Sequence, residues 1–592
     1  ECSDLKKILG LKQNEIYKNT RTLRYGQVVI MTDADLDGSH IKGLILNMFH
    51  CFWPSLLELG YVKAMVTPVI KVGKQWFFTE YEYHKAKPKG LPKYYKGLGT
   101  STSAEAKEYF KMLDKLLVEF KKDQKTDESM LLAFAKDRSN DRKQWLRDYM
   151  NTSDKPHIPY GNVNVLTVSD FIHKDQIKFS EEDIKRSIPH IMDGLKPSQR
   201  KVIYGCLKKN LERDMTVAQL AGYIGEHTAY HHGEASLQGT IVGLAQNFVG
   251  SNNMNLLVPS GQFGSRHEGG KDHASARYIS TRLSPWTKMI FNENDNPILN
   301  WLNEDGKSIE PEFFVTTTEM ALVNGCEGIG TGFSTYIPPY NPDDVNANIK
   351  RLLNKQPLVP MTPWFRGFKG TTTRKDKHTW VLEGIYKNGR VTELPPGKWI
   401  QDYKEFLDKM IEEGKIKGYD NHSTELEPNF LIHSASENFD PKITTTIHTS
   451  NMYLVTVNGK IKKFESPEEI LVEFAKTKLV YYKLRKKHMI ETTNKELELI
   501  QTKARFIELV IDETIKIFKK SRSQIEDQMK RNGIAEEYWD ECLNIKTYSY
   551  TNEEVAKMNE KLVKLRSELV RTEQTSIADM WKNDLDIVQE GE

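Results

Sequence analysis

Three aspartates, Asp33, Asp35 and Asp37, alternate along one short stretch of the chain and could hold a metal ion. They follow the apolar run at residues 28–31, which is typical of a buried strand, and Gly38 comes directly after them. Because acids at the carboxyl end of a strand in an α/β sheet lie where ligands bind, we expect the three carboxylates to converge on one point. Their mutual repulsion favours a hard divalent cation, and Mg²⁺ binds through few carboxylates together with substrate oxygens.

The acidic run has two other interpretations. Asp-x-Asp-x-Asp-Gly matches the first half of a calcium-binding loop, but the twelfth position, which needs a bidentate Glu, is Leu44. A strand rather than a helix also precedes the run. An isolated acidic triplet is more often a solvated turn, but the apolar strand before it and the amphipathic helix predicted over residues 41–58 favour the metal site.

A second group of residues that could do chemistry lies further along the chain. Arg186, Lys196 and Arg200 fall within one short, basic and helix-like stretch. Clustered cations there could bind phosphate, and a solvated basic face explains the spacing equally well. Tyr278 follows Arg277, and a phenol with a pKa of about 10 becomes a useful nucleophile only when adjacent cations favour the phenolate. Because the chain has 25 tyrosines, this pair alone does not identify a nucleophile.

Residues 264–271 nearly match a nucleotide-binding P-loop. The spacing is off by one, and Asp272 replaces the Ser or Thr that would hold Mg²⁺. We therefore predict no ATP site in this chain.

Size and composition bound the possible classes of protein. A chain of 592 residues is too long for one core, so several domains are expected. The net charge of only +3 means that any binding to nucleic acid must come from local clustering of the 84 lysines and arginines. Five scattered cysteines without CxxC spacing argue against a disulfide framework or a zinc site and favour a reducing compartment. No apolar run approaches the ~20 residues of a membrane span, and no signal peptide is recognisable.

The pattern along the chain predicts a multidomain protein of α/β plus α+β class. Residues 1–140 alternate strand-like and helix-like segments, which is typical of an α/β domain, and residues 141–180 are polar and irregular, which indicates a connector. Residues 181–335 contain short helices, one of them opening at Pro197, and then strand-like pieces, as in a winged-helix domain. The pattern over residues 336–460 predicts an accessory domain that mixes helices and strands. Its strand-like runs are residues 379–382, 443–448 and 453–457.

Residues 461–592 are predicted to be helical. Ser466 and Thr551 each open a capping box with a Glu three residues later, and Pro467 takes the first helical position. Apolar residues spaced 3, 4, 3 and 4 apart then form the seam of a coiled coil: Val555, Met558, Leu562, Leu565 and Leu569. The alternative is a helix packed on its own domain. We expect an antiparallel pair that projects from the body, contributes to dimerisation and shares so little core that removing residues 466–592 leaves residues 1–450 folded.

Taken together, the motifs resemble the DNA-cleavage core of a type IIA DNA topoisomerase over most of the chain. Residues 33–40 resemble the acidic motif of a TOPRIM domain, and residues 96–100 resemble its later loop. The runs that resemble the winged-helix domain are residues 186–189, 193–197, 230–234 and 249–253. The remaining matches are residues 276–279 to the nucleophile motif, 327–332 to the intercalating wedge and 580–585 to the end of the coiled-coil gate. By the same resemblance, residues 336–460 would be the tower domain.

The resemblance also bears on the source of the chain. Both halves, which bacteria divide between two subunits, lie here in one chain, as in eukaryotic-type enzymes. The sequence Asp-Ala-Asp-Leu-Asp is closer to the bacterial form of the acidic motif. The combination of a eukaryotic-type single chain with a bacterial-type motif suggests a divergent source such as a large DNA virus. The implied location is the nucleus for a cellular enzyme and the host cytoplasm for a viral one.

For the chemistry, the resemblance implies a covalent mechanism. Tyr278 would attack a backbone phosphate and form a 5′-phosphotyrosyl link, while Arg277 would neutralise the phosphate. The supporting donors to phosphate or to the 3′ side would be Arg186, His232 and Lys196.

The resemblance also implies a metal site and DNA contacts. The ligands of Mg²⁺, which Mn²⁺ or Ca²⁺ could replace, would be Asp33, Asp35 and Asp37. Lys96 and Arg200 would contact DNA. Ile329 would wedge between base pairs, although on spacing alone a buried core isoleucine in a tight turn is the better interpretation.

The implied partners are double-stranded DNA and a second copy of the chain, with no membrane. ATP would act only through an ATPase domain that is missing from this chain. One departure concerns the metal site, because the family also uses a Glu from a Glu-Gly-Asp-Ser-Ala motif that Glu1-Cys2-Ser3 does not match. That acid is expected to lie before residue 1, in a longer protein.

Two rival functions use only part of these features. A Mg²⁺-dependent nuclease or primase would use the acidic site without Tyr278. A DNA-clamping architectural protein would use the coiled-coil arm and the basic patches without any chemistry.

Overall fold

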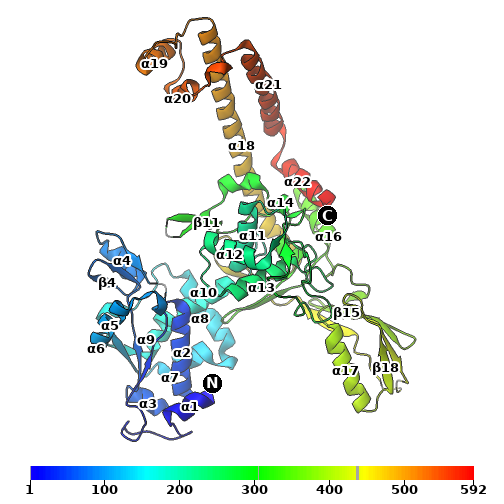
Figure 1. The fold of residues 1–592 in the computed structure, drawn as a ribbon. Helices are drawn as coiled ribbons and strands as arrows, with labels where there is room; N and C mark the ends of the chain where they lie inside the picture. The colour runs from blue at the N-terminus through cyan, green and yellow to red at the C-terminus, as the bar shows by residue number, and fades with distance from the viewer. Residues whose placement is uncertain (1, 96, 305, 435, 437–438, 592) are drawn as a thin grey trace. The chain divides into compact units, whose positions relative to one another are not determined.

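The computed structural model describes residues 2–95, 97–304, 306–434, 436 and 439–591 (Figure 1). The chain divides into two compact units. Unit 1 is Glu1–Ile188 with Glu327–Thr335, and unit 2 is Pro189–Cys326 with Tyr336–Glu592. Both units mix helices and strands, which confirms the predicted fold class at that level. Within the described residues, no helix is long and apolar enough to cross a membrane.

Unit 1 is built around a four-stranded sheet with the order β1-β2-β6-β7. Its strands are β1 (Val28–Ile30), β2 (Val62–Met65), β6 (Leu117–Lys121) and β7 (Val165–Thr167). The β1/β2 and β6/β7 pairs are parallel, and the β2/β6 pair is antiparallel. A smaller antiparallel sheet consists of β4 (Gln75–Phe77), β3 (Ile70–Val72) and β5 (Lys93–Tyr94).

The helices of unit 1 include the one predicted over residues 41–58, with different bounds. They are α1 (Cys2–Leu9), α2 (Leu36–Phe52), α3 (Pro54–Glu58), α4 (Glu80–Ala86), α5 (Ser103–Lys111), α6 (Leu113–Leu116), α7 (Thr126–Phe134), α8 (Ser139–Asn151), α9 (Val168–Phe171) and α10 (Ile177–Ser187). Short 3₁₀ turns cover Leu98–Thr100, Lys136–Arg138 and Tyr160–Asn162, and a π-helical turn covers Ile172–Gln176. The helix predicted over 41–58 begins five residues earlier, because Asp35 caps it, and breaks before Pro54, whose ring disfavours helical geometry in the preceding residue.

The predicted irregular connector at residues 141–180 is largely regular structure in unit 1. It contains most of α8, then β7 and α9, and it supplies buried apolar side chains such as Leu146, Leu166 and Phe171. The sequence pattern did not reveal these elements because polar residues on their outer faces interrupt the apolar ones and because β7 is only three residues long. The sheet edge β7 therefore belongs to the same layer as the strand that leads to the acidic run.

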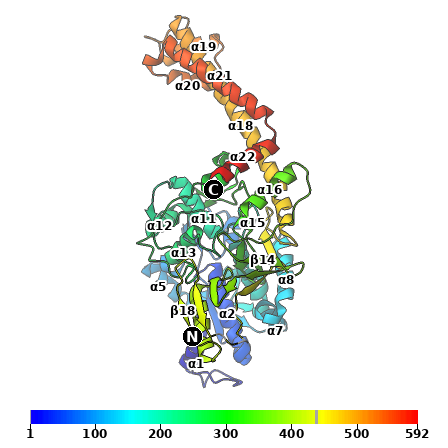
Figure 2. The same cartoon turned by 90° about the vertical axis from the view of Figure 1, so that its right-hand side faces the viewer.

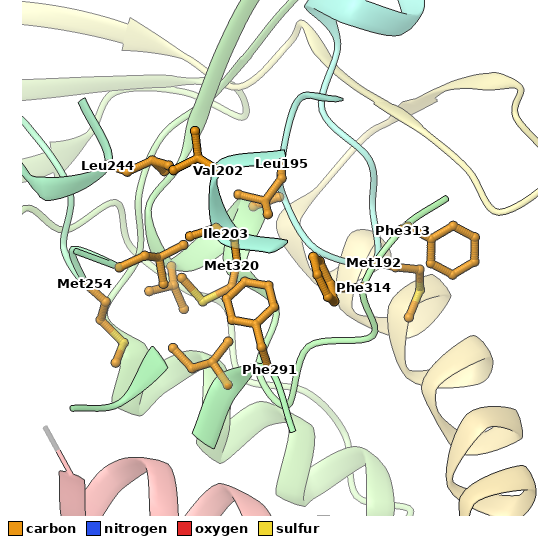
Figure 3. Packing of buried hydrophobic residues seen from close by; sticks show 14 of the residues in the cluster. Met192, Leu195, Val202, Ile203, Leu244, Met254, Phe291, Phe313, Phe314 and Met320 are labelled. Atoms are coloured by element: carbon orange, nitrogen blue, oxygen red, sulfur yellow. The ribbon is translucent and has the colours of Figure 1, made fainter. Parts of the chain in front are cut away.

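The core of unit 2 surrounds three helices, α11 (Pro197–Lys209), α12 (Val217–Thr228) and α13 (Glu234–Ala245). Figure 3 shows Val202 and Ile203 of α11 among Leu244, Met254, Phe291 and Met320, all of which are buried. The predicted helix start at Pro197 is confirmed. The short elements around these helices are β8 (Met215–Thr216), β9 (Ser280–Thr281), α14 (Thr287–Ile290), a 3₁₀ turn (Glu293–Ile298), β10 (Trp301–Glu304), β11 (Lys307–Pro311), α15 (Met320–Val323) and α16 (Pro342–Leu353).

Residues 371–464 form antiparallel sheets. One sheet has the order β14 (Thr371–Arg374), β15 (Thr379–Glu383), β20 (Thr444–His448), and another has β16 (Ile385–Lys387), β17 (Arg390–Glu393), β19 (Phe430–His433), β18 (Gly418–Asn421). A hairpin follows, β21 (Met452–Val455) with β22 (Ile461–Phe464). Helix α17 (Ile400–Glu412) packs Tyr403 and Leu407 against Phe430 of the second sheet. The three predicted strand runs are confirmed as β15, β20 and β21, within a few residues at their ends.

The C-terminal helices form an arm. They are α18 (Pro467–Ile511), α19 (Arg522–Arg531), α20 (Trp539–Leu543), α21 (Asn552–Gln574) and α22 (Ile577–Gly591), with 3₁₀ turns at Glu536–Tyr538 and Thr547–Ser549. Figures 1 and 2 show α18 and α21 side by side, with α19 and α20 at the far end of α18.

Both predicted N-cap residues of the arm cap their helices, but the reciprocal bond of a capping box, from the N-cap amide to the glutamate side chain, is not formed among the described residues. Ser466 Oγ accepts a hydrogen bond from the Glu469 amide, and Thr551 Oγ1 accepts one from the Glu554 amide, each at 3.2 Å. Helices α18 and α21 run antiparallel, since Lys561 pairs with Glu496 at 2.7 Å while Lys486 reaches the Glu573 carbonyl. The predicted seam faces α18, where Leu562 packs with Leu497 and Ile500.

The expectation that residues 466–592 share little core with the body is wrong. The first turns of α18 and the whole of α22 contribute to the main core of unit 2, through side chains that include Ile470, Phe474, Tyr482, Trp581 and Leu585. Only the distal part of α18, together with α19, α20 and α21, lies outside that core. Removal of residues 466–592 would therefore open the core of unit 2.

Charged side chains join the same elements. Asp295 accepts hydrogen bonds from Lys478 Nζ at 3.2 Å and from Arg485 Nε at 2.7 Å, and all three side chains are almost completely buried. Arg485 also bonds Asp584 of α22 at 2.6 Å. Burial lowers the pKa of the Lys478 ammonium to about 8, although Asp295 opposes this shift. The cluster ties α18 and α22 to the body by charge as well as by apolar packing.

Trp581→Ala is expected to lower the free energy of unfolding by about 3–5 kcal/mol, because the indole is fully buried, stacks on Tyr482 and donates to the Thr317 carbonyl at 2.8 Å. Chemical denaturation followed by circular dichroism measures the loss. Val563→Ala on the exposed side of α21 is the control and should change stability by less than about 0.5 kcal/mol. Equal effects of the two variants would contradict the placement of α22 in the core.

Candidate active-site residues

The acidic run lies between β1 and α2 of unit 1. Asp33 Oδ1 accepts a hydrogen bond from the Leu98 amide at 2.7 Å. Asp35 is the N-cap of α2, and its Oδ1 accepts from the Gly38 amide at 2.7 Å. Asp37 lies in the first turn of α2 and pairs with Arg186. A Cβ at Gly38 would approach the Asp33 carbonyl oxygen to 2.1 Å, so only glycine fits there.

The expected convergence of three carboxylates is not seen. Within the part of the chain that the structure describes, no group of three His, Cys, Asp or Glu side chains is placed to hold a metal ion. The reason is local, because Asp35 and Asp37 belong to the cap and first turn of a helix rather than to an extended strand end. Each carboxylate nevertheless keeps its Oδ2 out of the hydrogen bonds between described residues. This donor set fits Mg²⁺ bound through one or two carboxylates and other oxygens, and does not form a closed cage.

Arg186, at the end of α10, is the cation beside the acidic run. Its Nη1 lies 2.9 Å from Asp37 Oδ1, and its Nε lies 3.1 Å from Asp183 Oδ1. Burial alone would lower the pKa of the Arg186 guanidinium, but the bonds to the two carboxylates outweigh it and raise that pKa. Arg186 is therefore held by two acids, and a phosphate would have to compete with them.

Ile329 lies near the turn of a hairpin whose residues 327–335 group with unit 1. The strands are β12 (Cys326–Ile329) and β13 (Ser334–Ile337), and the Gly330 amide bonds the Phe333 carbonyl at 2.8 Å across the turn. The Ile329 side chain is 79% exposed. The interpretation of Ile329 as a buried core residue therefore does not hold.

The Tyr278 side chain is presented by a turn of unit 2, and it is 77% exposed. The turn is fixed to the start of α12, where the Val217 amide bonds the Ile279 carbonyl and the Ala218 amide bonds the Ala276 carbonyl, each at 3.0 Å. These bonds satisfy amides that the first turn of a helix leaves free. Ile279 points into the core, so Tyr278 faces solvent, with the Arg277 guanidinium 5.7 Å from its ring centre.

The other predicted basic residues of unit 2 differ in exposure. His232 is exposed and lies edge-on to the Tyr230 ring, and Lys196 is half-buried as the N-cap residue of α11. Arg200 is only 6% exposed and binds both oxygens of Asp193, at 2.7 and 3.0 Å. Its burial argues against a direct contact with DNA. Lys96 lies outside the described residues.

Asp183 is a residue of this region that the sequence interpretation missed. It bonds Arg186 from one turn earlier on α10 and also accepts from Thr331 of the Ile329 hairpin. The spacing of three residues between Asp183 and Arg186 was a usable signal, because such pairs meet on one helix face. Nothing local marked Thr331 as the second partner.

Comparison with known proteins places these features in a class. The family model for the A-type subunit of DNA gyrase/topoisomerase IV matches residues 186–586, and a model of the C-terminal associated domain of TOPRIM matches residues 65–184. The chain therefore belongs to the type II DNA topoisomerase family, as the motif resemblance predicted. Membership implies dependence on a divalent metal.

Individual relatives within this family are DNA topoisomerase 2 proteins of eukaryotes. DNA topoisomerase 2 of Arabidopsis thaliana is 44% identical over 571 residues, which cover 90% of this chain and 38% of that protein. The mitochondrial DNA topoisomerase 2 of Dictyostelium discoideum is 39% identical and covers 100% of this chain and 49% of that protein. The solved DNA-binding, cleavage and re-ligation domain of Plasmodium falciparum topoisomerase II matches with a TM-score of 0.81 and 39% identity, over 100% of this chain and 88% of that one. The chain thus spans less than half of the length of these two curated relatives.

Asp35→Asn is expected to weaken Mg²⁺ binding at the acidic run with little change in melting temperature. Asn caps a helix as well as Asp does, so the bond to the Gly38 amide is retained, whereas a neutral amide is a poorer cation ligand. The measurement is the shift in melting temperature on addition of Mg²⁺. Asp35→Ala is the control that also loses the cap, at a cost of about 0.5–2 kcal/mol. A wild-type Mg²⁺ response in Asp35→Asn would contradict the metal assignment.

Proposed function

We propose that this chain is the DNA-binding and cleavage core of a type II topoisomerase that cuts both strands of a duplex and rejoins them. The observation that carries the proposal is the match over the whole chain to the P. falciparum cleavage and re-ligation domain, with an exposed Tyr278 in the position of the nucleophile motif. The whole protein would use the transient break for strand passage. ATP hydrolysis would come from another part of that protein.

In the proposed reaction, Tyr278 Oη attacks a backbone phosphorus. The Oη–P bond forms as the bond to the 3′ oxygen breaks; the phenol gives up its proton and the departing 3′ oxygen takes one up, which leaves a 5′-phosphotyrosyl link and a 3′ hydroxyl. Arg277 is proposed to offset the charge that would develop on the phosphate, and the position of its guanidinium beside the phenol ring supports this role. His232 and Lys196 are proposed as further donors from unit 2, and Arg186 as a donor from unit 1. Religation is the reverse attack by the 3′ hydroxyl.

Asp33, Asp35 and Asp37 are proposed to hold Mg²⁺, for which Mn²⁺ or Ca²⁺ could substitute. The bound cation would supply charge stabilisation at a phosphate or 3′ oxygen. The exposure of Asp33 and Asp35 supports this assignment, because both residues face solvent and are open to a cation.

We further assign residues 1–140 to a TOPRIM domain, 181–335 to a winged-helix domain, 336–460 to a tower domain and 461–592 to a coiled-coil gate. Double-stranded DNA is the proposed substrate and a homodimer the proposed active form. The eukaryotic sources of the relatives support a nuclear location, and one relative is named as mitochondrial.

The deciding experiment incubates the protein with end-labelled duplex DNA and Mg²⁺ and separates the products on a denaturing gel. A protein-linked 5′ end supports the topoisomerase. Free cut ends indicate a metal-dependent nuclease, and intact DNA in a stable complex indicates an architectural protein.

Tyr278→Phe is expected to abolish the covalent adduct while DNA binding and melting temperature stay at wild-type values, because the side chain is exposed and only its hydroxyl is lost. Tyr548→Phe, at an equally exposed tyrosine of the arm, is the control and should form adduct normally. A 5′-linked adduct from Tyr278→Phe would remove this residue as the nucleophile.

Ile329→Ala is expected to reduce bending of a bound duplex, measured by energy transfer between labels at its two ends. An apolar side chain inserted at a base step unstacks it, and wider contacts offset the cost. Stability should change by less than about 0.5 kcal/mol, because Ile329 is exposed. Ile337→Ala, which truncates the buried isoleucine of β13, is the control and should cost about 2–5 kcal/mol. Normal bending by Ile329→Ala would exclude the wedge.

A further inference from the structure

We propose that Asp183 is a positioning residue that links the acidic run to the Ile329 hairpin by way of Arg186. The link is a chain of contacts within unit 1, from Asp37 through Arg186 and Asp183 to Thr331. The meaning given to its two ends, a cation site and a DNA wedge, rests on the proposed function. The contacts themselves do not depend on the proposed function.

The first part of the link is the sharing of one guanidinium by two carboxylates. Arg186 Nη1 lies 2.9 Å from Asp37 Oδ1, and Arg186 Nε lies 3.1 Å from Asp183 Oδ1. The Phe179 ring, 5.1 Å from the guanidinium carbon, fixes the position of the guanidinium. Phe179 also stacks on His40 of α2, with the ring centres 4.0 Å apart and the rings almost parallel. The guanidinium therefore has little freedom to leave one acid without disturbing its bond to the other.

The second part of the link joins Asp183 to the hairpin. Asp183 Oδ2 accepts from the Thr331 amide at 2.7 Å and from the Thr331 hydroxyl at 2.8 Å. Hydrogen bonds to a carboxylate are stronger than those to a neutral acceptor. Two oxygens of one side chain thus hold two different elements, with Oδ1 on Arg186 and Oδ2 on Thr331.

The hairpin also packs closely enough on α10 for this anchor to set its position. A Cβ at Gly328 would lie 2.0 Å from the Ser187 carbonyl oxygen, and one at Gly330 would lie 3.2 Å from the Asp183 carbonyl oxygen. Glycine at both positions brings the backbone against the end of α10. Ile329 lies between these two glycines, so a shift of the anchor moves its side chain.

A divalent cation at the acidic run would compete with Arg186 for Asp37. The guanidinium would then keep Asp183 as its remaining carboxylate, and the orientation of Asp183 towards Thr331 would change. The link therefore makes the hairpin sensitive to the occupancy of the acidic run. A purely structural anchor would hold the hairpin equally with and without a cation.

Amide hydrogen exchange by mass spectrometry on the whole chain, without DNA, tests the link. With Mg²⁺ alone as the probe, exchange in residues 327–335 should accelerate about two- to fivefold, the range that a partly exposed ion pair supports. Asp37→Asn should produce a similar acceleration without Mg²⁺ and should no longer respond to it. Asp183→Ala should accelerate exchange about tenfold, because the Thr331 amide loses its charged acceptor.

The control is Asp170→Asn, which removes another surface ion pair of unit 1, to Lys174 at 2.8 Å, and should keep the wild-type Mg²⁺ response. Unchanged protection of α7 in every variant establishes that unit 1 remains folded. The link is overturned if Mg²⁺ and Asp37→Asn leave exchange in residues 327–335 at the wild-type rate, even when Asp183→Ala accelerates it. It is also overturned if Asp183→Ala has no effect. Because no DNA is present, either result is independent of adduct formation by Tyr278, and a lack of adduct leaves the link standing.

Discussion

Buried charge at the base of α18 is the constraint on which the arrangement of unit 2 depends. Lys478 and Arg485 have no access to water, so both need the Asp295 carboxylate, and Arg485 also needs Asp584. Loss of one partner from such a cluster typically costs about 3–5 kcal/mol, because the remaining charge stays buried. The body, the root of the arm and the C-terminal helix must therefore be present together. For this reason the arm cannot be removed without disrupting unit 2, although the distal part of the arm lies outside the core.

Sequence patterns predicted an element correctly where residues close by in the chain determine that element. The capping residues Ser466 and Thr551, the proline at 197 and the heptad seam each identify a structure that a few neighbouring side chains determine. The connector and the deletion boundary were mispredicted for the opposite reason. Leu166 is buried by a sheet, and Trp581 by a core made mostly of residues far earlier in the chain, and no local pattern reports such partners.

The predictions for the candidate site residues also had different outcomes. Residue types and spacing singled out Asp35, whereas Tyr278 and Ile329 were chosen from the family resemblance, and the structure places all three at the surface. Neither approach predicted that Arg200 would be buried against Asp193, or that Arg186 would pair with an aspartate 149 positions away. Charge alone does not distinguish a cation that meets a ligand from one that holds the fold together. That distinction depends on which carboxylates the fold brings nearby.

The length of α18 has a mechanical consequence. Its 45 residues form one unbroken helix, which at 1.5 Å per residue is about 67 Å long. The part beyond Arg485 is about 39 Å long by the same rise, and a rotation of the helix at the buried charged cluster would move its far end most. A rotation of ~10° at the cluster would displace that end by roughly 7 Å over that length. A small rotation at the buried cluster would thus be amplified into a displacement of several ångströms at the far end of α18.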